Sequence, residues 1–169
     1  MIIPPINFKK WIEDNRDLLK PPVCNKVVYE NTEFIIMVVG GPNVRKDFHV
    51  DEGEEFFYQL EGDMLLKIIE NGKVKDIKIK KNDIFLLPPR VPHSPQRYKD
   101  TIGLVIERRR KENELDGFQW YCDNCNELLY EKFIVLKDIV KQLPILFEEF
   151  WSNHNARTCK KCNGYLQKP

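Results

Sequence analysis

Short runs of β-branched and aromatic residues follow one another along most of this chain, and they constrain its fold more than any other feature. They occupy residues 26–30, 33–39, 54–59, 63–70, 73–79, 84–87 and 101–108. Runs of this length and composition are typical of β-strands. Turn residues separate them and no helical repeat intervenes, which is the pattern of an antiparallel sandwich or barrel. We therefore expect a mainly β fold.

Two local signals add detail to this expectation. Asn71 and Gly72 stand between two of the runs and favour a tight hairpin, because a type I′ turn needs positive φ at both central residues. Ahead of the first run, Asn7 is a suitable cap for a short amphipathic helix that contains Trp11.

The strand pattern ends near residue 115, where charged residues and Gly117 interrupt it. We place a domain boundary there, with a β domain over residues 1–115 and a C-terminal extension over residues 116–169. Within the extension, residues 136–151 have helical character, and Pro144 is expected to interrupt that helix.

Opposite charges nearly cancel in this chain, with 27 Lys and Arg against 26 Asp and Glu. No long-range attraction to nucleic acid or to a membrane is therefore expected. The basic run 108–111 precedes Glu112 and Glu114 and contains no aromatic residue, so we interpret it as a solvated loop. The N-terminus has no signal-peptide pattern, and no apolar stretch approaches the roughly 20 residues of a membrane span. We expect a soluble cytoplasmic protein with a small-molecule partner.

Two of the three histidines, His49 and His93, are candidates to bind a metal together with Glu55. Two imidazoles and one carboxylate hold non-haem Fe(II) and leave positions open for substrate and oxygen. A hydrolytic Zn(II) centre can use the same ligands, so the set indicates a metal but not a reaction. Glu55 is preferred within the acidic run 51–55 because it lies on the opposite strand face from Glu54. The alternative is two ordinary histidines and a solvated acidic loop.

This spacing resembles the two metal-binding motifs of the cupin superfamily. The matching positions are His49, Glu55 and Gly62 in the first motif and Pro88 and His93 in the second. Asp51 replaces the second histidine of the first motif, and the departures at other motif positions are Asn43, Asn82, Arg90 and Arg97. The resemblance implies a jelly-roll-like β-barrel with a three-ligand metal site.

Two arginines point to an acidic ligand. Arg45 and Arg97 each lie four residues from a candidate histidine ligand, and on an extended chain such residues share a face. A buried arginine pair is costly unless an anion completes it, and the planar guanidinium matches a carboxylate. The pair therefore predicts a small acid near the metal. Exposed arginines paired with Asp47 or Asp100 are the alternative.

Glu107 ends the last of the strand-like runs. It lies opposite the apolar face formed by Ile102, Leu104 and Ile106, so it enters the cavity if that face packs between sheets. The alternative is a strand-end glutamate that offsets the charge of residues 108–110.

Longer stretches around these residues resemble the 3-hydroxyanthranilate 3,4-dioxygenase family. They are residues 40–49, 55–64 and 88–97, together with the cysteine-containing tail of the shorter family members, so the resemblance covers nearly the entire chain. It implies an enzyme that opens the ring of 3-hydroxyanthranilate with O2 to give 2-amino-3-carboxymuconate semialdehyde, the precursor of quinolinate in the kynurenine route to NAD. A homodimer is also expected.

The resemblance implies a role for each candidate residue. The roles are Fe(II) binding by His49, Glu55 and His93, binding of the substrate carboxylate by Arg97 with help from Arg45, and contact of Glu107 with the substrate's amino and hydroxyl groups.

Four of the five cysteines form two Cys-x-x-Cys pairs, Cys122 with Cys125 and Cys159 with Cys162. This spacing suits a rubredoxin-like Fe or Zn site in a reducing compartment better than a disulfide framework. Asn126 and Gly164 are expected to adopt the turned backbone that brings amides toward the sulfurs. Four protein ligands close such a site to substrate. Four unmetallated buried cysteines are the alternative.

Other functions remain open at this point. One is a different cupin dioxygenase that acts on another phenol or on a thiol, and the other is a non-catalytic module whose barrel only binds ligands. Two residues stay outside every motif. We interpret Cys24 as an apolar filler and His154 as a surface histidine.

Overall fold

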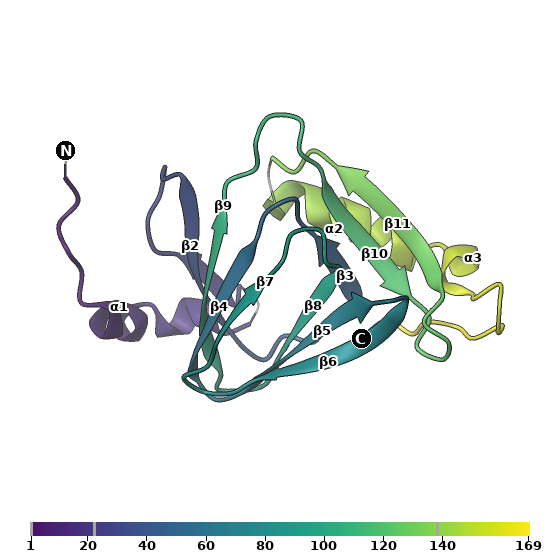
Figure 1. Cartoon of the computed structure of the whole chain (residues 1–169), viewed down its shortest axis with the longest axis horizontal. Coiled ribbons are helices and arrows are strands. Elements are labelled where there is room, and N and C mark those ends of the chain that lie inside the picture. Colours follow the sequence, from purple (N-terminus) through teal and green to yellow (C-terminus); the bar gives the residue numbers. More distant parts are fainter. Residues whose placement is uncertain (1, 22, 138) are drawn as a thin grey trace.

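The computed structural model describes residues 2–21, 23–137 and 139–169 of the chain. Two antiparallel sheets face each other and form a barrel-like body (Figure 1). One sheet has the strand order β1-β2-β9-β4-β7 and the other has the order β11-β10-β3-β8-β5-β6. The strands are β1 (Asn25–Val27), β2 (Phe34–Gly40), β3 (Asp47–Val50), β4 (Glu55–Glu61), β5 (Met64–Glu70), β6 (Lys73–Ile79), β7 (Ile84–Leu87), β8 (His93–Arg97), β9 (Ile102–Arg108), β10 (Asp116–Tyr121) and β11 (Leu128–Ile134). The predicted mainly β fold is confirmed.

The helices lie at the two ends of the chain (Figure 1). They are α1 (Phe8–Asp14), the 3-10 helix η1 (Arg16–Leu19), α2 (Ile139–Trp151) and α3 (His154–Arg157). The Asn7 side chain accepts a hydrogen bond from the backbone N–H of Lys10 at 3.0 Å, which confirms the predicted cap of α1. Among the described residues, the helices are all too short or too polar to cross a membrane.

The hairpin between β5 and β6 forms as predicted. Asn71 has φ 52° and Gly72 has φ 72°, and the flanking Glu70 and Lys73 are paired. Both central residues thus have the positive φ that a type I′ turn requires.

The main hydrophobic core lies between the two sheets. Phe57 and Val105 from one sheet meet Met64, Leu66 and Ile68 from the other, and all five are buried. Each such side chain contributes about 1.5–3 kcal/mol relative to exposure. This core gives the barrel a source of stability that does not depend on a metal.

The C-terminal segment is joined to the barrel through a strand. β10 begins at Asp116, directly after the predicted boundary, and pairs with β3 of the six-stranded sheet. The strand after β10, β11, extends the same sheet. The division into domains at residue 115 stays a prediction, but the two segments share a sheet.

Helix α2 lies against β10 and β11 (Figure 1). It runs through Pro144 without a break, so the predicted interruption is wrong. Packing of Leu146 and Phe150 against Phe118 and Trp120 outweighs the backbone hydrogen bond that proline cannot make. Residue 138, part of the predicted helical stretch, lies outside the described residues.

Candidate metal and substrate site

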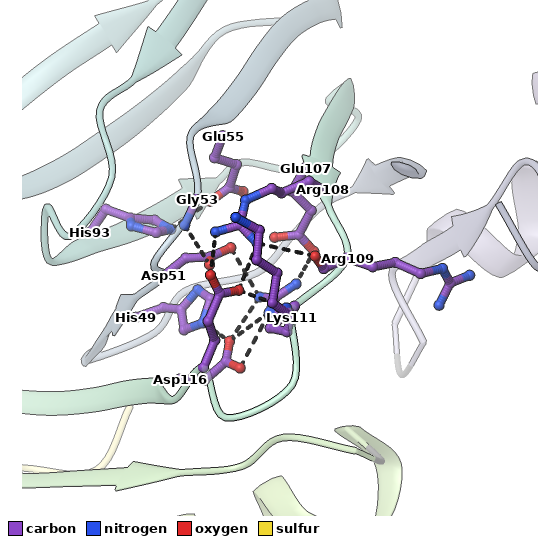
Figure 2. Close-up of polar contacts among 12 residues, drawn as sticks. His49, Asp51, Gly53, Glu55, His93, Glu107, Arg108, Arg109, Lys111 and Asp116 are labelled. Carbon is purple, nitrogen blue, oxygen red and sulfur yellow. Dashed lines mark hydrogen bonds and ion pairs between the residues drawn. The ribbon is translucent and has the colours of Figure 1, made fainter. Parts of the chain in front are cut away.

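Three strands bring the candidate metal ligands together inside the barrel. His49 on β3 pairs with His93 on β8, and Glu55 begins β4 beside them. One ligand atom from each residue lies within 4.8 Å of the others. Nε2 of His93 is 2.8 Å from Oε2 of Glu55. In Figure 2 the three side chains point toward one region.

The surroundings of these side chains fit a divalent metal. Oε2 of Glu55 is buried, and the polar atom that faces it at 2.8 Å is Nε2 of His93, another of the candidate ligands. The ring of His49 is held through Nε2 by Asp116 at 2.7 Å, and the ring of His93 through Nδ1 by the Val91 carbonyl at 3.0 Å. Metal-binding histidines typically use their second nitrogen in this way. Burial raises the pKa of Glu55, but the charge of His93 outweighs it and lowers that pKa overall, so the carboxylate is ionised.

Within the part of the chain that the structure describes, Arg97 is a buried cation without a counter-ion. It is 2% exposed, and Nη1 donates to the neutral amide oxygen of Gln59 at 3.2 Å. Nε has no partner, and no carboxylate of the described residues lies within ion-pair distance. Burial lowers the pKa of Arg97 to about 10, which leaves it charged at neutral pH. A buried charge of this kind is costly until an anion joins it.

Gly103 makes room for this arginine. It lies on β9, and a Cβ atom there would come within 2.6 Å of Nη1 of Arg97 and 2.7 Å of Oε1 of Gln59. Gln59 also donates to the Glu61 carbonyl at 3.0 Å, which turns its amide oxygen toward Arg97. Sequence reasoning did not single out Gly103 or Gln59, because their roles depend on how strands pair.

Arg45 has a different setting. It is partly buried and forms an ion pair with Asp47, the partner that the alternative interpretation named. Burial lowers the pKa of Arg45, but Asp47 and then Glu55 raise it overall. Arg45 therefore lies near the metal ligands but already has a counter-ion, in contrast to Arg97.

Glu107 enters the interior, but the premise of that prediction is wrong. Val105, on the same strand face as Glu107, packs between the sheets. Ile102 and Leu104 instead pack on the outer side, against residues of the N-terminal helices. Glu107 is buried and lies opposite Glu55 in the β4–β9 pair. Burial raises the pKa of Glu107 to about 7, although Arg110 acts in the other direction. Nη1 of Arg110 is 2.9 Å from its carboxylate.

The prediction of a solvated loop at residues 108–111 is wrong for Arg110. Its side chain is only 15% exposed and also contacts Asp116 at 2.8 Å and Asp51 at 3.2 Å. Two of its partners, Glu107 and Asp116, are close to it in the sequence and Asp51 is distant. Burial of this group depends on how β9 and β10 meet the rest of the fold, which a local charge pattern cannot reveal. Arg109, in contrast, is exposed.

Aromatic residues of the C-terminal segment form one wall of the site. The ring of Phe118 on β10 lies 5.2 Å from that of His49, and Phe147 on α2 lies 6.0 Å from Phe118. These side chains shield the His49 ring from solvent. Their contribution was missed because the C-terminal segment was assigned to a separate unit.

The four cysteines of the tail form a compact cluster. Their sulfurs lie within 4.8 Å of one another, with 3.5 Å between Cys122 and Cys162 and 3.6 Å between Cys125 and Cys159. All are free thiols. A tetrahedral metal with bonds of about 2.3 Å separates its sulfurs by roughly 3.8 Å, so the cluster fits one ion.

The two cysteine pairs are built alike. Cys122 and Cys159 each donate a backbone hydrogen bond of 2.8 Å, to the carbonyls of Glu127 and Gly164 respectively. Asn126 and Asn163 have φ values of 59° and 57°. The prediction for Asn126 is confirmed.

The second turned residue is Asn163 and not Gly164, so that prediction is wrong. Gly164 leaves room beside the cluster instead, since a Cβ there would lie 2.5 Å from Nδ2 of Asn124 and 3.2 Å from Sγ of Cys162. The two residues outside every motif, Cys24 and His154, belong to neither group of metal ligands. Cys24 is buried beside the Pro42 carbonyl, and exposed His154 stacks on Tyr165.

Known proteins resemble this chain in fold and in sequence. A solved cupin-2 domain containing protein from Shewanella frigidimarina matches with a TM-score of 0.50 and 19% identity, covering 62% of this chain and 94% of that one. The match confirms the predicted cupin fold.

Sequence relatives are much closer. A curated 3-hydroxyanthranilate 3,4-dioxygenase from Xanthomonas euvesicatoria is 56% identical over 166 residues, which cover 98% of this chain and 93% of that protein. Proteins of the same name from Xenopus tropicalis and Shewanella woodyi are each 53% identical and cover 92% of this chain, with 55% and 83% of their own lengths matched. The family model described as 3-hydroxyanthranilic acid dioxygenase matches residues 1–151. The chain belongs to the 3-hydroxyanthranilic acid dioxygenase family.

Proposed function

We propose that this chain opens the aromatic ring of 3-hydroxyanthranilate with O2 and forms 2-amino-3-carboxymuconate semialdehyde, the precursor of quinolinate. Its family and its curated relatives support a ring-cleaving dioxygenase and this substrate. The observation on the chain itself that carries the proposal is Arg97, a buried cation that lacks an anion.

The substrate supplies the missing anion. Arg97 is fixed by Gln59 on one edge, and its Nε on another edge has no partner among the residues that the structure describes. A guanidinium binds a carboxylate through two parallel hydrogen bonds, so the ring acid fits this position. Arg45, which is partly buried, assists in binding the carboxylate. The carboxylate thus orients the ring relative to His49, Glu55 and His93.

We assign Fe(II) to His49, Glu55 and His93. Bound Fe(II) supplies open coordination positions for the substrate's hydroxyl and amino groups and for O2. Glu107 lies next to Glu55 and has a pKa of about 7, which suits proton exchange with these groups near neutral pH. The apolar core and Phe118 exclude water from the reacting ring.

We assign a second metal, Fe or Zn, to the four cysteines, where it holds the tail together. The Cys-x-x-Cys spacing suits a metal better than disulfides and so supports a reducing compartment, for which we propose the cytoplasm.

A homodimer is supported by the outer face of the five-stranded sheet. Phe34, Ile84 and Leu86 are 52%, 67% and 53% exposed there, beside the partly buried Phe56 and Ile106. An antiparallel sheet normally has one polar face, so an apolar outer face needs a cover. A second copy of the chain would bring the same apolar row to meet it.

The experiment is an oxygen-uptake assay after anaerobic loading with Fe(II). We expect one O2 consumed for each 3-hydroxyanthranilate, and quinolinate in the product mixture by mass spectrometry. Absence of substrate-dependent uptake by protein with full iron occupancy would contradict the proposal.

A further inference from the structure

Arg110 connects three carboxylates from separate parts of the fold. It lies between β9 and β10, and its ion-pair distances are 2.9 Å to Glu107, 2.8 Å to Asp116 and 3.2 Å to Asp51. Its Nε also donates to Asp116 at 3.0 Å. Figure 2 shows the three acidic side chains around one network of polar contacts.

Each of these carboxylates supports a different part of the proposed active site. Oδ1 of Asp116, which accepts from Arg110, is the same atom that contacts His49 at 2.7 Å. Glu107 is the acid placed near the substrate.

Asp51 acts on the turn that leads into β4. Its Oδ1 accepts from the backbone N–H of Gly53 at 2.9 Å, two residues before Glu55. Arg110 therefore contacts Asp116, which holds the ligand His49, and Asp51, which supports the turn before the ligand Glu55. It also contacts the acid Glu107 directly.

We infer that Arg110 is a positioning residue, which orients His49 through Asp116 and holds Glu107 at the substrate. The inference rests on the proposed function. A guanidinium has five N–H donors in one plane and can bond several carboxylates together, whereas an ammonium is a point charge. Without it, the three acids and Glu55 would repel one another and move apart.

The test compares Arg110→Met and Arg110→Lys with the neighbouring exposed arginine changed in the same ways, Arg109→Met and Arg109→Lys. For each protein we would measure the Kd for Fe(II) by anaerobic titration, the Tm without metal, and kcat and KM for 3-hydroxyanthranilate. Loss of a residue that supports a metal ligand typically costs 10- to 100-fold in affinity or activity.

We expect Arg110→Met to weaken Fe(II) binding by about 10-fold or more and to lower kcat at saturating iron, with Arg110→Lys in between. The Arg109 variants should match wild type within about twofold. A purely structural ion pair would change Tm alone. Equal Fe(II) affinity and equal kcat for Arg110→Met and Arg109→Met would overturn the inference. If Arg110→Met does not fold, the same comparison between the two lysine variants decides.

A double variant isolates the route through Asp116. If Arg110 acts on His49 through this residue, Arg110→Met should weaken Fe(II) binding much less in an Asp116→Asn background than in wild type. Additive losses would contradict that route. Fe(II) affinity is measured without substrate, so failure of wild-type turnover would count against the proposed function and not against this result.

Discussion

The barrel and the tail each gather metal ligands, but they do so in opposite ways. In the barrel, three ligands of two kinds come from three strands, and His93 lies far from His49 and Glu55 in the sequence. In the tail, four identical ligands come from two copies of one short turn. The barrel site leaves coordination positions open and the tail site does not. The open barrel site suits catalysis, and the closed tail site suits stabilisation of the fold.

The source of stability differs in the same way. A hydrophobic core between two sheets supports the barrel around its ligands. The tail has a smaller core around Trp120 and Phe150, and among the described residues the segment after α2 adds to it only the buried Leu166 and the partly buried Ala156. We therefore expect metal loss to impair activity in the barrel and stability in the tail.

The largest expected effect is loss of a barrel ligand. His49→Ala, Glu55→Ala and His93→Ala should each abolish oxygen uptake, because each removes one of three ligands. Circular dichroism and the Tm of the metal-free protein should stay close to wild type, since the core is unchanged. Full turnover by any of these variants at saturating iron would show that the triad is misassigned.

Loss of a tail ligand should lower the stability of the protein, in contrast to loss of a barrel ligand. Cys122→Ser or Cys159→Ser should lose one metal equivalent by elemental analysis and several kcal/mol of stability, because closed sites contribute folding free energy. Cys24→Ser is the matched control and should keep both equivalents, since that thiol lies outside the cluster. Retention of both equivalents by the Cys122 variant would refute the assignment.

Arg97 should matter for the substrate and not for the metal. Removal of one partner from a buried charged pair typically costs about 2–5 kcal/mol, so Arg97→Ala should lower kcat/KM by roughly 30-fold or more. Arg97→Lys should recover only part, because it keeps the charge without the planar fork. The ratio of kcat/KM for 3-hydroxyanthranilate to that for 2-aminophenol tests whether Arg97 binds the carboxylate, since 2-aminophenol lacks this group. An unchanged ratio in Arg97→Ala would mean that another residue recognises the carboxylate.

Gly103 should show a smaller effect of the same kind. In Gly103→Ala the new methyl group displaces the Arg97 guanidinium, and we expect KM to rise by about 10-fold, or roughly 1.4 kcal/mol. Gly72→Ala serves as control, because it lies in the β5–β6 hairpin with no atom near its Cβ position and should affect only stability. We would measure KM for both variants by steady-state kinetics. Equal KM values would contradict this role of Gly103.

Local patterns were sufficient for much of this molecule. The strand-like runs, the Asn71-Gly72 hairpin and the Asn7 cap depend on neighbouring residues, and the structure confirms them. The cysteine motif is local in the same sense. The strands β3 and β8 were not predicted, although they carry both histidines, because polar residues and Pro95 break their apolar pattern.

Long-range contacts account for what was missed. Asp116 supports His49 from 67 positions away, and Gln59 and Arg97 are 38 positions apart. No spacing rule connects such residues. Arg110 looked like a surface charge for a different reason. Glu107 and Asp116 are its neighbours in the sequence, but only the placement of β9 and β10 buries the three side chains together.

The central claim is that the open site in the barrel carries ring cleavage and the closed site in the tail does not. We would load metal-free protein with one equivalent of Zn(II), which the four thiolates favour, and then with one equivalent of Fe(II) under anaerobic conditions. Oxygen uptake with 3-hydroxyanthranilate is then measured. The account predicts the same turnover per barrel iron as in protein that holds iron at both sites. Absence of uptake until iron replaces zinc in the tail would contradict it.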